Sequence, residues 1–514
     1  MASWDDGYVT DIVYTSNFYR ECTPVWLTTA CLLLGHRAPD LTKPFRYADL
    51  GCGHGFTALT VAATCPQAEV WGFDFNPAHI DSARSLATRA GLTNAHFVET
   101  SFADLARADL PDFDFIVSHG VLSWISPANQ AHLIGVIGRR LRPGGLAYLS
   151  YNVTTGWTGM VPLRALMRQL SEASPERTDL AVPGILDYLD RLKAGGAVFF
   201  PAHPALDSRM AEIRKQDSRY IAHEFLNQDW HPMMFADVAR AMIDAKCGYL
   251  GSATLSENID AVSVPASVVP LLNEARDPVL RETLRDFGAA QGFRRDIYRR
   301  GVQAMPLAEH TALVEDLSLS WTGLVAGDQV NIPTPLGPVT GRPEIYRPLL
   351  AMLENGPVSI RQIRATQTFA QRPLLELLQA VALLIGGGYA HPVLPGGASH
   401  AGRAASAGLN RAIAAANVLG ADMPRVVVPA IGSVFNVDLL ETLLVGELLA
   451  GKPAELESLT TAVLGMLEQS GRAVQRDGQP VSDAGQARTI VMDVLRSMLE
   501  RRVPMLRGLG VLEG

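Results

Sequence analysis

The sequence contains little cysteine, and none at the spacing of a metal site. Its 514 residues include five cysteines, an odd number, and no two of them form a Cys-x-x-Cys pair. This usage argues against a disulfide framework and against a structural zinc site. It is typical of a reducing compartment, so we expect a cytoplasmic enzyme that holds no metal.

Long apolar runs, basic blocks and several catalytic motifs are also lacking. No stretch approaches the roughly 18 apolar residues that cross a bilayer, and the acidic start MASWDDGYVTD is unlike a signal peptide. The formal net charge is −8 and no basic block interrupts it, so we expect neither a membrane span nor a nucleic-acid partner. The chain has no His-Glu-x-x-His, Gly-x-Ser-x-Gly or P-loop sequence.

From about residue 46, the chain alternates between strand patterns and helix patterns. Strands separated by helices of this length indicate parallel crossover connections and a sheet covered on both faces. We expect strands at residues 45–50, 68–75, 95–99, 112–120 and 146–153, and helices at residues 56–65, 76–91 and 129–145.

Two more strands and one helix follow after a helical stretch. We expect strands at residues 219–226 and 248–255, with a helix at residues 235–246 between them. Seven strands in all predict an α/β domain with a seven-stranded, Rossmann-like sheet over residues 1–265. Residues 158–218 would then form a helical insertion between the fifth and sixth strands.

The second half of the chain is mainly helical and is divided by small residues. Glycine and proline gather at residues 326–344 and, with alanine and serine, at residues 395–408, so we expect flexible links there. The predicted units are a helical regulatory or linker region at residues 266–345, a winged-helix-like module ended by a small hairpin at residues 346–400, and a C-terminal helical domain at residues 401–514.

Three glycines stand where the first strand passes into the first helix, in the stretch DLGCGHGFT. A glycine-rich turn at this point of an α/β unit handles a nucleotide. Dinucleotide sites favour Gly-x-Gly-x-x-Gly, whereas Gly51, Gly53 and Gly55 have the spacing Gly-x-Gly-x-Gly, with Asp49 two positions earlier. That carboxylate would repel a pyrophosphate but attract a cofactor with a cationic end. We therefore predict S-adenosyl-L-methionine, with S-adenosyl-L-homocysteine as its product.

A second acidic residue supports a nucleoside at this site. Asp74 ends the second predicted strand, where a carboxylate can accept hydrogen bonds from both ribose hydroxyls. Phe75 follows it and is placed to pack on the adenine ring. Cys52, inside the loop, is predicted to be a small residue that fits beside the cofactor. The alternative is a tight turn with two unrelated acids nearby.

On these motifs the chain resembles a class I, seven-stranded S-adenosylmethionine-dependent methyltransferase, and FADVARAMIDAKCGYLGSATL is similar to the closing segment of that fold. Within that class it resembles the rickettsial-type bacterial protein-lysine methyltransferases. The similar segments are SHGVLSW, YNVTTGW, YIAHEFLNQDWHPMMFADV, GSATLSENI and the leader YVTDIVYTSNFYRECTP. The resemblance implies a methyltransferase domain followed by a methyltransferase regulatory domain and a further C-terminal domain.

Two positions depart from the pattern of that family. Ser101, followed by Phe102, comes after the third strand, where many methyltransferases have an aspartate for the adenine amino group. Thr155 replaces the proline of the motif Tyr-Asn-x-x-Pro-Gly-Trp. We still expect Ser101 and Phe102 at the cofactor, with a weaker adenine contact.

Residues just after the fourth and fifth strands should face the site, because it lies at the carboxyl ends of the strands. We expect His119 to contact the cofactor or relay a proton, and Tyr151, Asn152 and Trp157 to shape an acceptor channel. The alternatives are a strand cap for His119, a simple turn for Tyr151 and Asn152, and core packing for Trp124 and Trp157.

The resemblance also implies that aromatic residues of the leader lie over the cofactor. We predict that Tyr14 and Phe18 form a lid, the alternative being that they seal the first helix. His223 and Glu224 suggest an acid and a base, but strand alternation would put them on opposite faces and favours a structural pair. His231 is expected in a loop.

Methyl transfer from a sulfonium needs a neutral nucleophile that is held at near-attack distance and shielded from water. We therefore predict transfer to lysine ε-amines of a protein substrate, by in-line displacement in a desolvated aromatic pocket. A small-molecule N- or O-methyltransferase and a non-catalytic, cofactor-binding regulator remain as alternatives. The oligomeric state is left open, a homodimer included.

Overall fold

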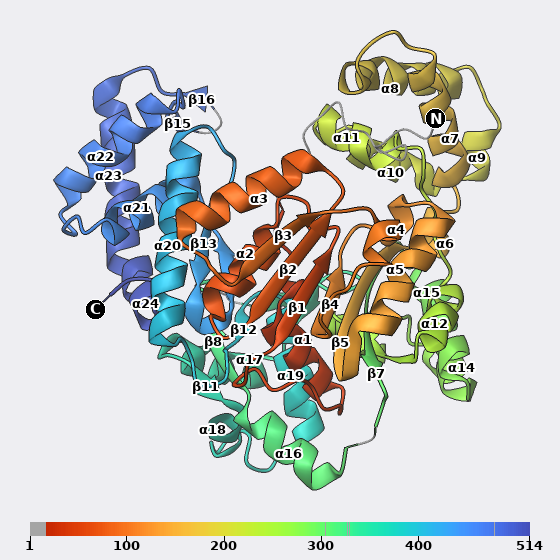
Figure 1. Ribbon diagram of the computed structural model, residues 1–514, viewed down its shortest axis with the longest axis horizontal. Coiled ribbons are helices and arrows are strands. Elements are labelled where there is room, and N and C mark those ends of the chain that lie inside the picture. The colour runs from red at the N-terminus through yellow and green to blue at the C-terminus, as the bar shows by residue number, and fades with distance from the viewer. Residues whose placement is uncertain (1–16, 304, 326, 328, 477–478, 514) are drawn as a thin grey trace.

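A seven-stranded sheet forms the centre of the computed structural model, which describes residues 17–303, 305–325, 327, 329–476 and 479–513 (Figure 1). The strands lie in the order β3-β2-β1-β4-β5-β7-β6, and β7 is antiparallel to both of its neighbours. They are β1 (Arg46–Leu50), β2 (Glu69–Asp74), β3 (Ala95–Glu99), β4 (Phe113–Ser118), β5 (Leu141–Asn152), β6 (Cys247–Ser252) and β7 (Phe293–Arg300). The predicted α/β, Rossmann-like class is confirmed.

Both faces of the sheet are covered, as the apolar strands predicted. The covering helices are α1 (Pro24–Leu33), α2 (Phe56–Thr64) and α3 (Pro77–Ala90) on one face, and α5 (Pro127–Arg140) and α12 (Phe235–Asp244) on the other. In β1, Tyr47 packs into the core under α1, α2 and α3, whereas Ala48 and Leu50 pack into the core under α5 and α12. Successive side chains alternate between the two cores because a strand has a period of two.

Local signals define the ends of the covering helices. Asn76 caps α3 by accepting a hydrogen bond from the Ala78 N–H at 2.9 Å, and Gly91 ends the helix with a φ of 71°. The helix α5 ends at Arg140, earlier than predicted. The last three residues of the predicted range, Pro143, Gly144 and Gly145, lie inside β5, where the pairing with β4 shifts its register.

A helical insertion follows β5 and has its own hydrophobic core. It consists of α6 (Thr154–Trp157), α7 (Met160–Glu172), α8 (Thr178–Ala194), α9 (Phe199–Ala202), α10 (Ala205–Ile213) and α11 (Ser218–Phe225). In Figure 1 it lies at the upper right, beyond the carboxyl ends of the central strands. The predicted insertion is therefore present, and it extends to Phe225.

The strand predicted at residues 219–226 is wrong, because this segment is the helix α11. Asp217 caps the helix, and Ile221, Ala222 and Phe225 lie on one buried helical face. The seventh strand is instead β7, whose sequence FRRDIYRR looks too charged for a sheet interior. It is accommodated because Arg294 pairs with Asp286 at 2.6 Å and with Asp296 at 2.9 Å.

The domain boundary predicted at residue 265 is consequently wrong. The helices α13 (Asp260–Ser263), α14 (Val269–Glu274) and α15 (Pro278–Ala289) lead to β7, which pairs with β5 and β6 inside the main sheet. A regulatory or linker region that begins at residue 266 would cut this sheet apart. The methyltransferase fold is complete only at Arg300.

A small module follows the sheet. It contains α16 (Leu307–Asp316), α17 (Pro343–Glu354), α18 (Ile360–Arg364) and α19 (Leu374–Gly386), with a sheet of β8 (Ser318–Trp321), β11 (Val358–Ser359) and β12 (Ala390–Pro392). The expected closing hairpin is wrong, because β12 pairs with the earlier strand β8. The Pro- and Gly-rich stretch before α17 contains the paired strands β9 (Asn331–Ile332) and β10 (Val339–Thr340). The likeness to a winged helix stays a prediction.

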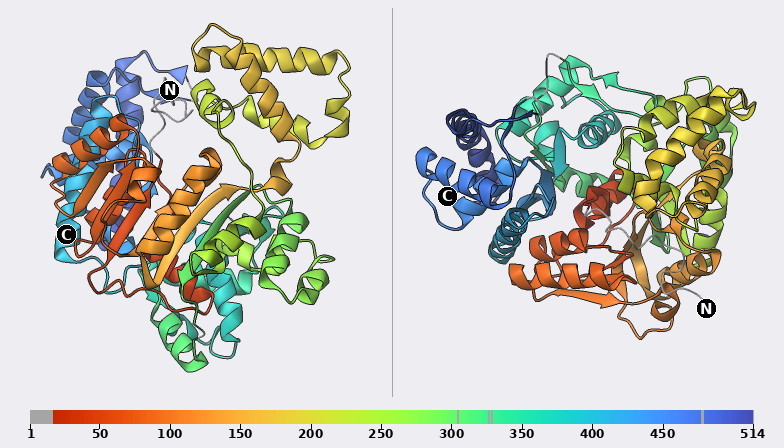
Figure 2. Two further views of the ribbon diagram at one scale, coloured as in Figure 1. Left: turned by 45° about the vertical axis from the view of Figure 1, so that its right-hand side comes forward. Right: turned by 90° about the horizontal axis from the view of Figure 1, so that it is seen from above.

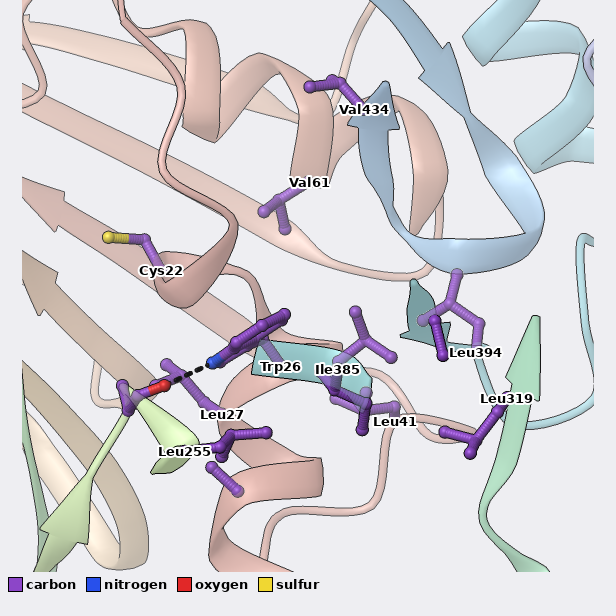
Figure 3. Close-up of a cluster of buried hydrophobic side chains, with 14 of the residues drawn as sticks. Cys22, Trp26, Leu27, Leu41, Val61, Leu255, Leu319, Ile385, Leu394 and Val434 are labelled. Atoms are coloured by element: carbon purple, nitrogen blue, oxygen red, sulfur yellow. Dashed lines mark hydrogen bonds between the residues drawn. The ribbon is translucent and has the colours of Figure 1, made fainter. Parts of the chain in front are cut away.

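The helix α1 joins the sheet to this module. Figure 3 shows Trp26 of α1 packed among side chains from distant parts of the chain, with Leu255 and Ile385 nearby. The Trp26 indole N–H donates a hydrogen bond to the Ala253 carbonyl oxygen at 2.8 Å. One continuous hydrophobic core therefore runs from the sheet through α1 into α19.

The C-terminal part packs directly on the methyltransferase fold. It contains α20 (His400–Val418), the hairpin of β13 (Arg425–Val428) and β14 (Ser433–Asn436), α21 (Leu439–Leu449), α22 (Leu456–Gln469), the pair β15 (Gln475–Arg476) and β16 (Gln479–Pro480), α23 (Ala484–Ser497) and α24 (Val503–Gly508). Figures 1 and 2 show these helices and the insertion on opposite sides of the sheet.

The flexible link predicted at residues 395–408 is wrong, because α20 begins at His400. A Cβ on Gly408 would lie 2.5 Å from the Ala90 carbonyl oxygen of α3. The Ser406 hydroxyl donates a hydrogen bond to the Ala63 carbonyl oxygen of α2 at 3.4 Å. The small residues of this stretch therefore allow close helix packing rather than flexibility.

Candidate active site

A cavity of about 480 Å³ opens at the carboxyl ends of β1 and β4. The chain leaves β1 toward β2 and β3 and leaves β4 toward β5, so this is the point where the strand order reverses. The volume lies within the roughly 300–1,000 Å³ of small-molecule sites. Its walls come from the loops after β1, β2, β3 and β4, from α11 and from the segment before α1.

The glycine loop gives this cavity its floor. Gly51, Gly53 and Gly55 have φ values of 78°, 54° and 70°, a region that L side chains rarely adopt. A Cβ on Gly51 would lie 2.5 Å from a Val121 methyl, and one on Gly55 would lie 2.5 Å from the Phe97 ring. A Cβ on Gly53 would meet no protein atom within 4 Å, although Gly53 lines the cavity. The open side of the loop is therefore turned toward a ligand.

Asp74 ties the glycine loop to the end of β2. Its carboxylate accepts hydrogen bonds from the Gly53 N–H at 2.8 Å and from the Asn76 N–H at 2.9 Å. The His79 ring nitrogen Nδ1 lies 3.2 Å from the same carboxylate. Asp74, Phe75 and Cys52 all line the cavity, as predicted for cofactor-binding residues. Burial holds the pKa of the Cys52 thiol well above its usual range, so this cysteine is no nucleophile.

Asp49 lies behind the loop and not in the cavity wall. Asp49 is 7% exposed. Near the end of β1, its charge acts on Cys22, Tyr47 and Cys52. Burial, and secondarily the negative charge of Asp74, raise the pKa of Asp49 to about 7. A cation in the cavity would stabilise the ionised pair, so the donor set fits a positively charged cofactor. Gly55 is likewise outside the wall, where it caps α2.

Ser101 and Phe102 both line the cavity, where the sequence placed them. Ser101 caps the short helix α4 (Phe102–Leu105), because its hydroxyl oxygen accepts a hydrogen bond from the Asp104 N–H at 3.1 Å. The same hydroxyl donates to the Asp104 carboxylate at 2.8 Å. The Ser101 hydroxyl is therefore occupied by Asp104 of its own helix, so it is less available for a hydrogen bond to a ligand.

His119 and Tyr19 form one wall of the cavity. Their rings are stacked, with centroids 3.5 Å apart. The His119 Nδ1 lies 2.7 Å from the Tyr148 hydroxyl. Burial and the nearby Arg295 cation hold the pKa of His119 well below its usual range. A neutral imidazole fits a contact with the cofactor, but it is a poor carrier for a proton.

Comparisons with known proteins identify the class of enzyme. Residues 48–145 match the model of a methyltransferase domain, and residues 217–300 match that of a predicted methyltransferase regulatory domain. An uncharacterized protein of Synechocystis is 32% identical over 509 residues, which cover 99% of this chain and 100% of that protein. The chain belongs to the S-adenosylmethionine-dependent methyltransferases with a regulatory domain. Its cofactor is S-adenosylmethionine, and its product form is S-adenosylhomocysteine.

A solved structure shares the whole fold of this methyltransferase. PKMT2 from Rickettsia typhi in complex with AdoHcy has a TM-score of 0.71 and 20% identity, over 96% of this chain and 99% of that chain. Trans-aconitate 2-methyltransferase of Streptomyces coelicolor is 34% identical over 157 residues, which cover 30% of this chain and 48% of that enzyme. The first match extends over the accessory half, whereas the second covers less than a third of this chain.

The regulatory-domain match corrects the position expected for this unit. Residues 217–300 run from α11 to β7, so they supply the last two strands of the sheet and one wall of the cavity. The matched regulatory domain therefore begins before residue 266 and ends before residue 345. The same segment builds the fold and the site.

Three residues predicted to shape the acceptor channel lie outside the cavity wall. Tyr151 is buried and donates a hydrogen bond from its hydroxyl to Asp296 at 2.6 Å. Asn152 is 5% exposed and donates its backbone N–H to the Ser123 hydroxyl at 2.9 Å. Trp157 donates its indole N–H to the Gly292 carbonyl oxygen at 2.7 Å. Tyr151 of β5 packs in the sheet core and Trp157 of α6 packs against the insertion, so the acceptor channel that they were expected to shape stays a prediction.

The leader is described only from residue 17, so the predicted lid residue Tyr14 lies outside the described residues. Phe18 packs edge-on against Phe56, with ring centroids 6.2 Å apart. The neighbouring Tyr19, which the sequence reasoning passed over, lines the cavity instead. Trp124, interpreted as core packing, also lines it.

Two further wall residues were assigned to the wrong element. His223 and Glu224 line the cavity from α11, whereas a strand at this position suggested a structural pair. The signal was available in the sequence, since Asp217 is a helix cap and apolar residues recur at helical spacing after it. His231 lies in a loop outside the cavity, 2.9 Å from the Asp229 carboxylate.

Glu224 is half-buried near the end of α11. Burial raises its pKa to about 7, and the nearby Arg164 cation opposes this shift only in part.

Across the described residues, no group of three or more metal-ligating side chains is positioned to hold an ion. Within the same residues, we find no helix with the length and apolarity that a bilayer crossing requires.

Proposed function

We propose that this methyltransferase acts on an amine, and specifically on lysine ε-amines of a protein substrate. The observation that carries the proposal is the cavity wall beyond the cofactor loop. It offers the aromatic rings of Tyr19 and Trp124 and the carboxyl group of Glu224, and its described lining includes neither lysine nor arginine. Such a wall attracts an ammonium group and then favours its neutral form.

The cofactor part of the proposal rests on the loop geometry. Gly51 and Gly53 leave backbone space for the cofactor, Asp74 holds the loop from β2, and Phe75 and Phe102 offer ring faces for the adenine. The bound cofactor supplies an electrophilic methyl group on a sulfonium. The chain's own contribution is to orient the acceptor and to exclude water from it.

His119 has a positioning role in this proposal. It stacks on Tyr19 and meets the Tyr148 hydroxyl, so it keeps both rings in place beside the cofactor. Asp49 acts at a distance through its charge, since its carboxyl group lies behind the loop. Neither residue needs to bond to the acceptor.

Trans-aconitate 2-methyltransferases match part of this chain and suggest the second candidate, a small-molecule acceptor. Aconitate is a polycarboxylate, and a site for it calls for cationic groups. The described cavity wall carries acidic and aromatic groups in their place. An anionic metabolite is therefore the weaker candidate, whereas a small amine stays within the proposed chemistry.

A DNA-binding regulator is also disfavoured. Arg361 of α18 pairs with Asp316 at 2.7 Å and with Glu315 at 2.9 Å, and Arg364 pairs with Glu315. The charge of these two arginines of the winged-helix-like module is already compensated, which weakens their attraction for phosphates.

We propose three units in place of the predicted boundaries. The catalytic unit extends to residue 303, the winged-helix-like module spans residues 305–394, and the C-terminal unit spans residues 400–513. The last two together offer a large surface for a polypeptide substrate, which supports a macromolecular acceptor.

The proposal is tested with labelled S-adenosylmethionine. Purified protein is incubated with a cell lysate, and the labelled positions are mapped by mass spectrometry. We expect label on lysine side chains, and we expect none with Asp74→Ala, which removes the acceptor of the Gly53 N–H. Label that is confined to small molecules or to oxygen atoms would overturn the lysine assignment.

A further inference from the structure

The wall that α11 contributes contains one acidic group that the methyltransferase fold does not use. Glu224 lines the cavity, and among the described residues its carboxylate has no hydrogen-bond or ion-pair partner. Most buried polar groups in proteins are paired. An acidic group that faces a cavity without a partner is therefore available to a ligand.

The groups around Glu224 come from α11, the segment before α1, α7 and the loop after α11. The side chain of Tyr220 lies one helical turn before it on α11, and the Tyr19 phenol faces it from the segment before α1. Arg164 approaches it from α7 of the insertion. The titratable and charged groups near Glu224 are Tyr19, Tyr220, His223, Arg164 and, on the far side of Arg164, Asp229.

Arg164 is fixed in its position and does not itself enter the cavity wall. It is buried, it lies over the Trp230 ring at 5.1 Å, and it donates a hydrogen bond to the Asn227 carbonyl oxygen. The Arg164 charge therefore acts on Glu224 from the insertion, close to the C-terminal end of α11, and not from within the cavity wall. The insertion both carries the acidic group and sets its electrostatic environment.

We propose that Glu224 receives the acceptor ammonium and takes its proton before methyl transfer. This inference rests on the proposed amine acceptor. An N–H bond of the ammonium breaks, its electron pair stays on nitrogen, and an O–H bond forms on the Glu224 carboxylate. The freed lone pair then forms the new N–C bond, and the S–C electron pair stays on sulfur. The carboxylic acid returns its proton to solvent, which its partial exposure allows.

The pKa of Glu224 suits a proton acceptor better than the pKa of His119 does. The Glu224 carboxyl has a pKa of about 7, so it is ionised above neutral pH and accepts a proton readily near it. His119 remains neutral and is occupied by the Tyr148 hydroxyl. It serves as a positioning residue for the Tyr19 ring, on which it stacks.

The kinetic test compares Glu224→Gln with a matched control, Asp229→Asn. Both substitutions remove one carboxylate near Arg164, but Asp229 is not part of the cavity wall. We expect Glu224→Gln to lower kcat/KM at pH 7.5 by about 100-fold or more, with unchanged affinity for S-adenosylhomocysteine. We expect Asp229→Asn to stay within a few-fold of the parent.

The pH profile gives a readout that a structural role would not change. The parent's kcat/KM should rise until about pH 7 and then level off, because Glu224 is then ionised. In Glu224→Gln the rate should continue to rise toward the lysine pKa of about 10.4, because free amine must then come from solution. Glu224→Asp should keep the break in the profile.

A measurement on the unaltered protein guards against a variant that fails to fold. Nα-acetyl-lysine amide is titrated into the complex with S-adenosylhomocysteine, by calorimetry in two buffers of different ionisation enthalpy. At pH 6 we expect binding to release close to one proton, because the ammonium forces Glu224 to ionise. At pH 8 we expect almost no proton release. Proton release that does not change with pH would overturn the inference.

The two proposals fail in different ways. If the protein N-methylates lysine and Glu224→Gln has the parent's rate and pH profile, the role of Glu224 is wrong and the amine acceptor stands. If the product analysis finds methyl groups only on oxygen or carbon, the amine acceptor itself is wrong.

Discussion

At the scale of single residues, two carboxylates give the cofactor site its electrostatic character. Asp74 accepts hydrogen bonds from the Gly53 and Asn76 N–H groups, whereas Asp49 is buried with no such bond from the described residues and has a pKa of about 7. Bringing two acidic groups together in a buried place is costly unless a cation arrives. The site is thus prepared for a positively charged ligand and is less stable without it.

Cofactor binding should therefore be coupled to the ionisation of Asp49. Because a sulfonium favours the carboxylate, S-adenosylmethionine affinity should rise roughly tenfold between pH 6 and pH 8. In Asp49→Asn this rise should be absent. Calorimetry at several pH values measures the effect, and S-adenosylhomocysteine, which lacks the sulfonium charge, serves as the comparison. A parent affinity that is independent of pH would contradict the prediction.

The same group predicts how the cofactor-free protein responds to pH. Its folded pKa of about 7 lies above the unfolded value of about 3.9. The folded state then binds the extra proton between these values, so its contribution to stability is present below about pH 4 and is lost as the pH rises to 7. Urea unfolding at pH 5 and pH 7.5 should show a smaller loss of stability in Asp49→Asn than in the parent.

The glycine loop offers a pair of substitutions that separate binding from folding. Gly53→Ala meets no protein atom, so it should fold with a loss of about 1–2 kcal/mol from its φ of 54°, and cofactor affinity should fall at least about tenfold. Gly55→Ala would place its Cβ 2.5 Å from the Phe97 ring, so it should mainly lower the unfolding temperature. Calorimetry and thermal unfolding distinguish the two. Equal effects on both readouts would contradict the assignment.

At the scale of elements, β7 and α11 explain how charged segments become part of the interior. The helix α11 turns one face to the core of the insertion and presents Glu224 to the cavity. The strand β7 carries Arg294 into the sheet, where Asp286, Asp296 and Glu282 surround it. The strand β7 is tolerated because Arg294 meets partners from α15 and from its own strand, whereas α11 places Glu224 at the cavity.

Removal of the central cation should therefore destabilise the sheet. Arg294→Met leaves three acidic groups in a buried place and should cost about 3–5 kcal/mol. Arg240→Met breaks an exposed pair with Asp237, whose side chains are 70% and 64% exposed, and should cost at most about 1 kcal/mol. Urea unfolding measures both changes. Similar losses for the two variants would mean that the buried cluster contributes little.

At the scale of the whole molecule, the described residues of the accessory parts pack directly on the catalytic fold. The helix α1 shares one core with the sheet and with α19, and α20 lies against α2 and α3. Their contacts use small residues and a buried tryptophan, so the approach of the backbones is close. The parts should unfold together rather than one by one.

Two glycines in C-terminal helices test this close packing. Gly408→Ala would place a Cβ 2.5 Å from the Ala90 carbonyl oxygen, and we expect a loss of about 1–3 kcal/mol. Gly465→Ala in α22 meets nothing within 4 Å, so it should gain about 0.4–1 kcal/mol from helix propensity. Thermal unfolding with a probe in the catalytic part gives the answer. A stabilising Gly408→Ala would show that α20 does not press on α3.

The sequence by itself determined the class of the molecule and its cofactor loop. Alternating strands and helices, the caps of α3, the spacing of Gly51, Gly53 and Gly55, and the two acids are local features, and local features follow from neighbouring residues. These features predicted the fold class and the first five strands. They also predicted four residues of the cavity wall, Asp74, Phe75, Ser101 and Phe102.

Only the tertiary structure decided which side chains form the cavity wall beyond the cofactor loop. Tyr151 and Trp157 follow the correct strand, but contacts with Asp296 and Gly292 turn them away, whereas Tyr19 and Glu224 arrive from segments far along the chain. The sequence pattern did not predict the strand β7, because Arg294 is neutralised by residues that only folding brings near. Long-range pairing of charges and close packing of helices leave no periodic pattern, so a single sequence does not reveal them.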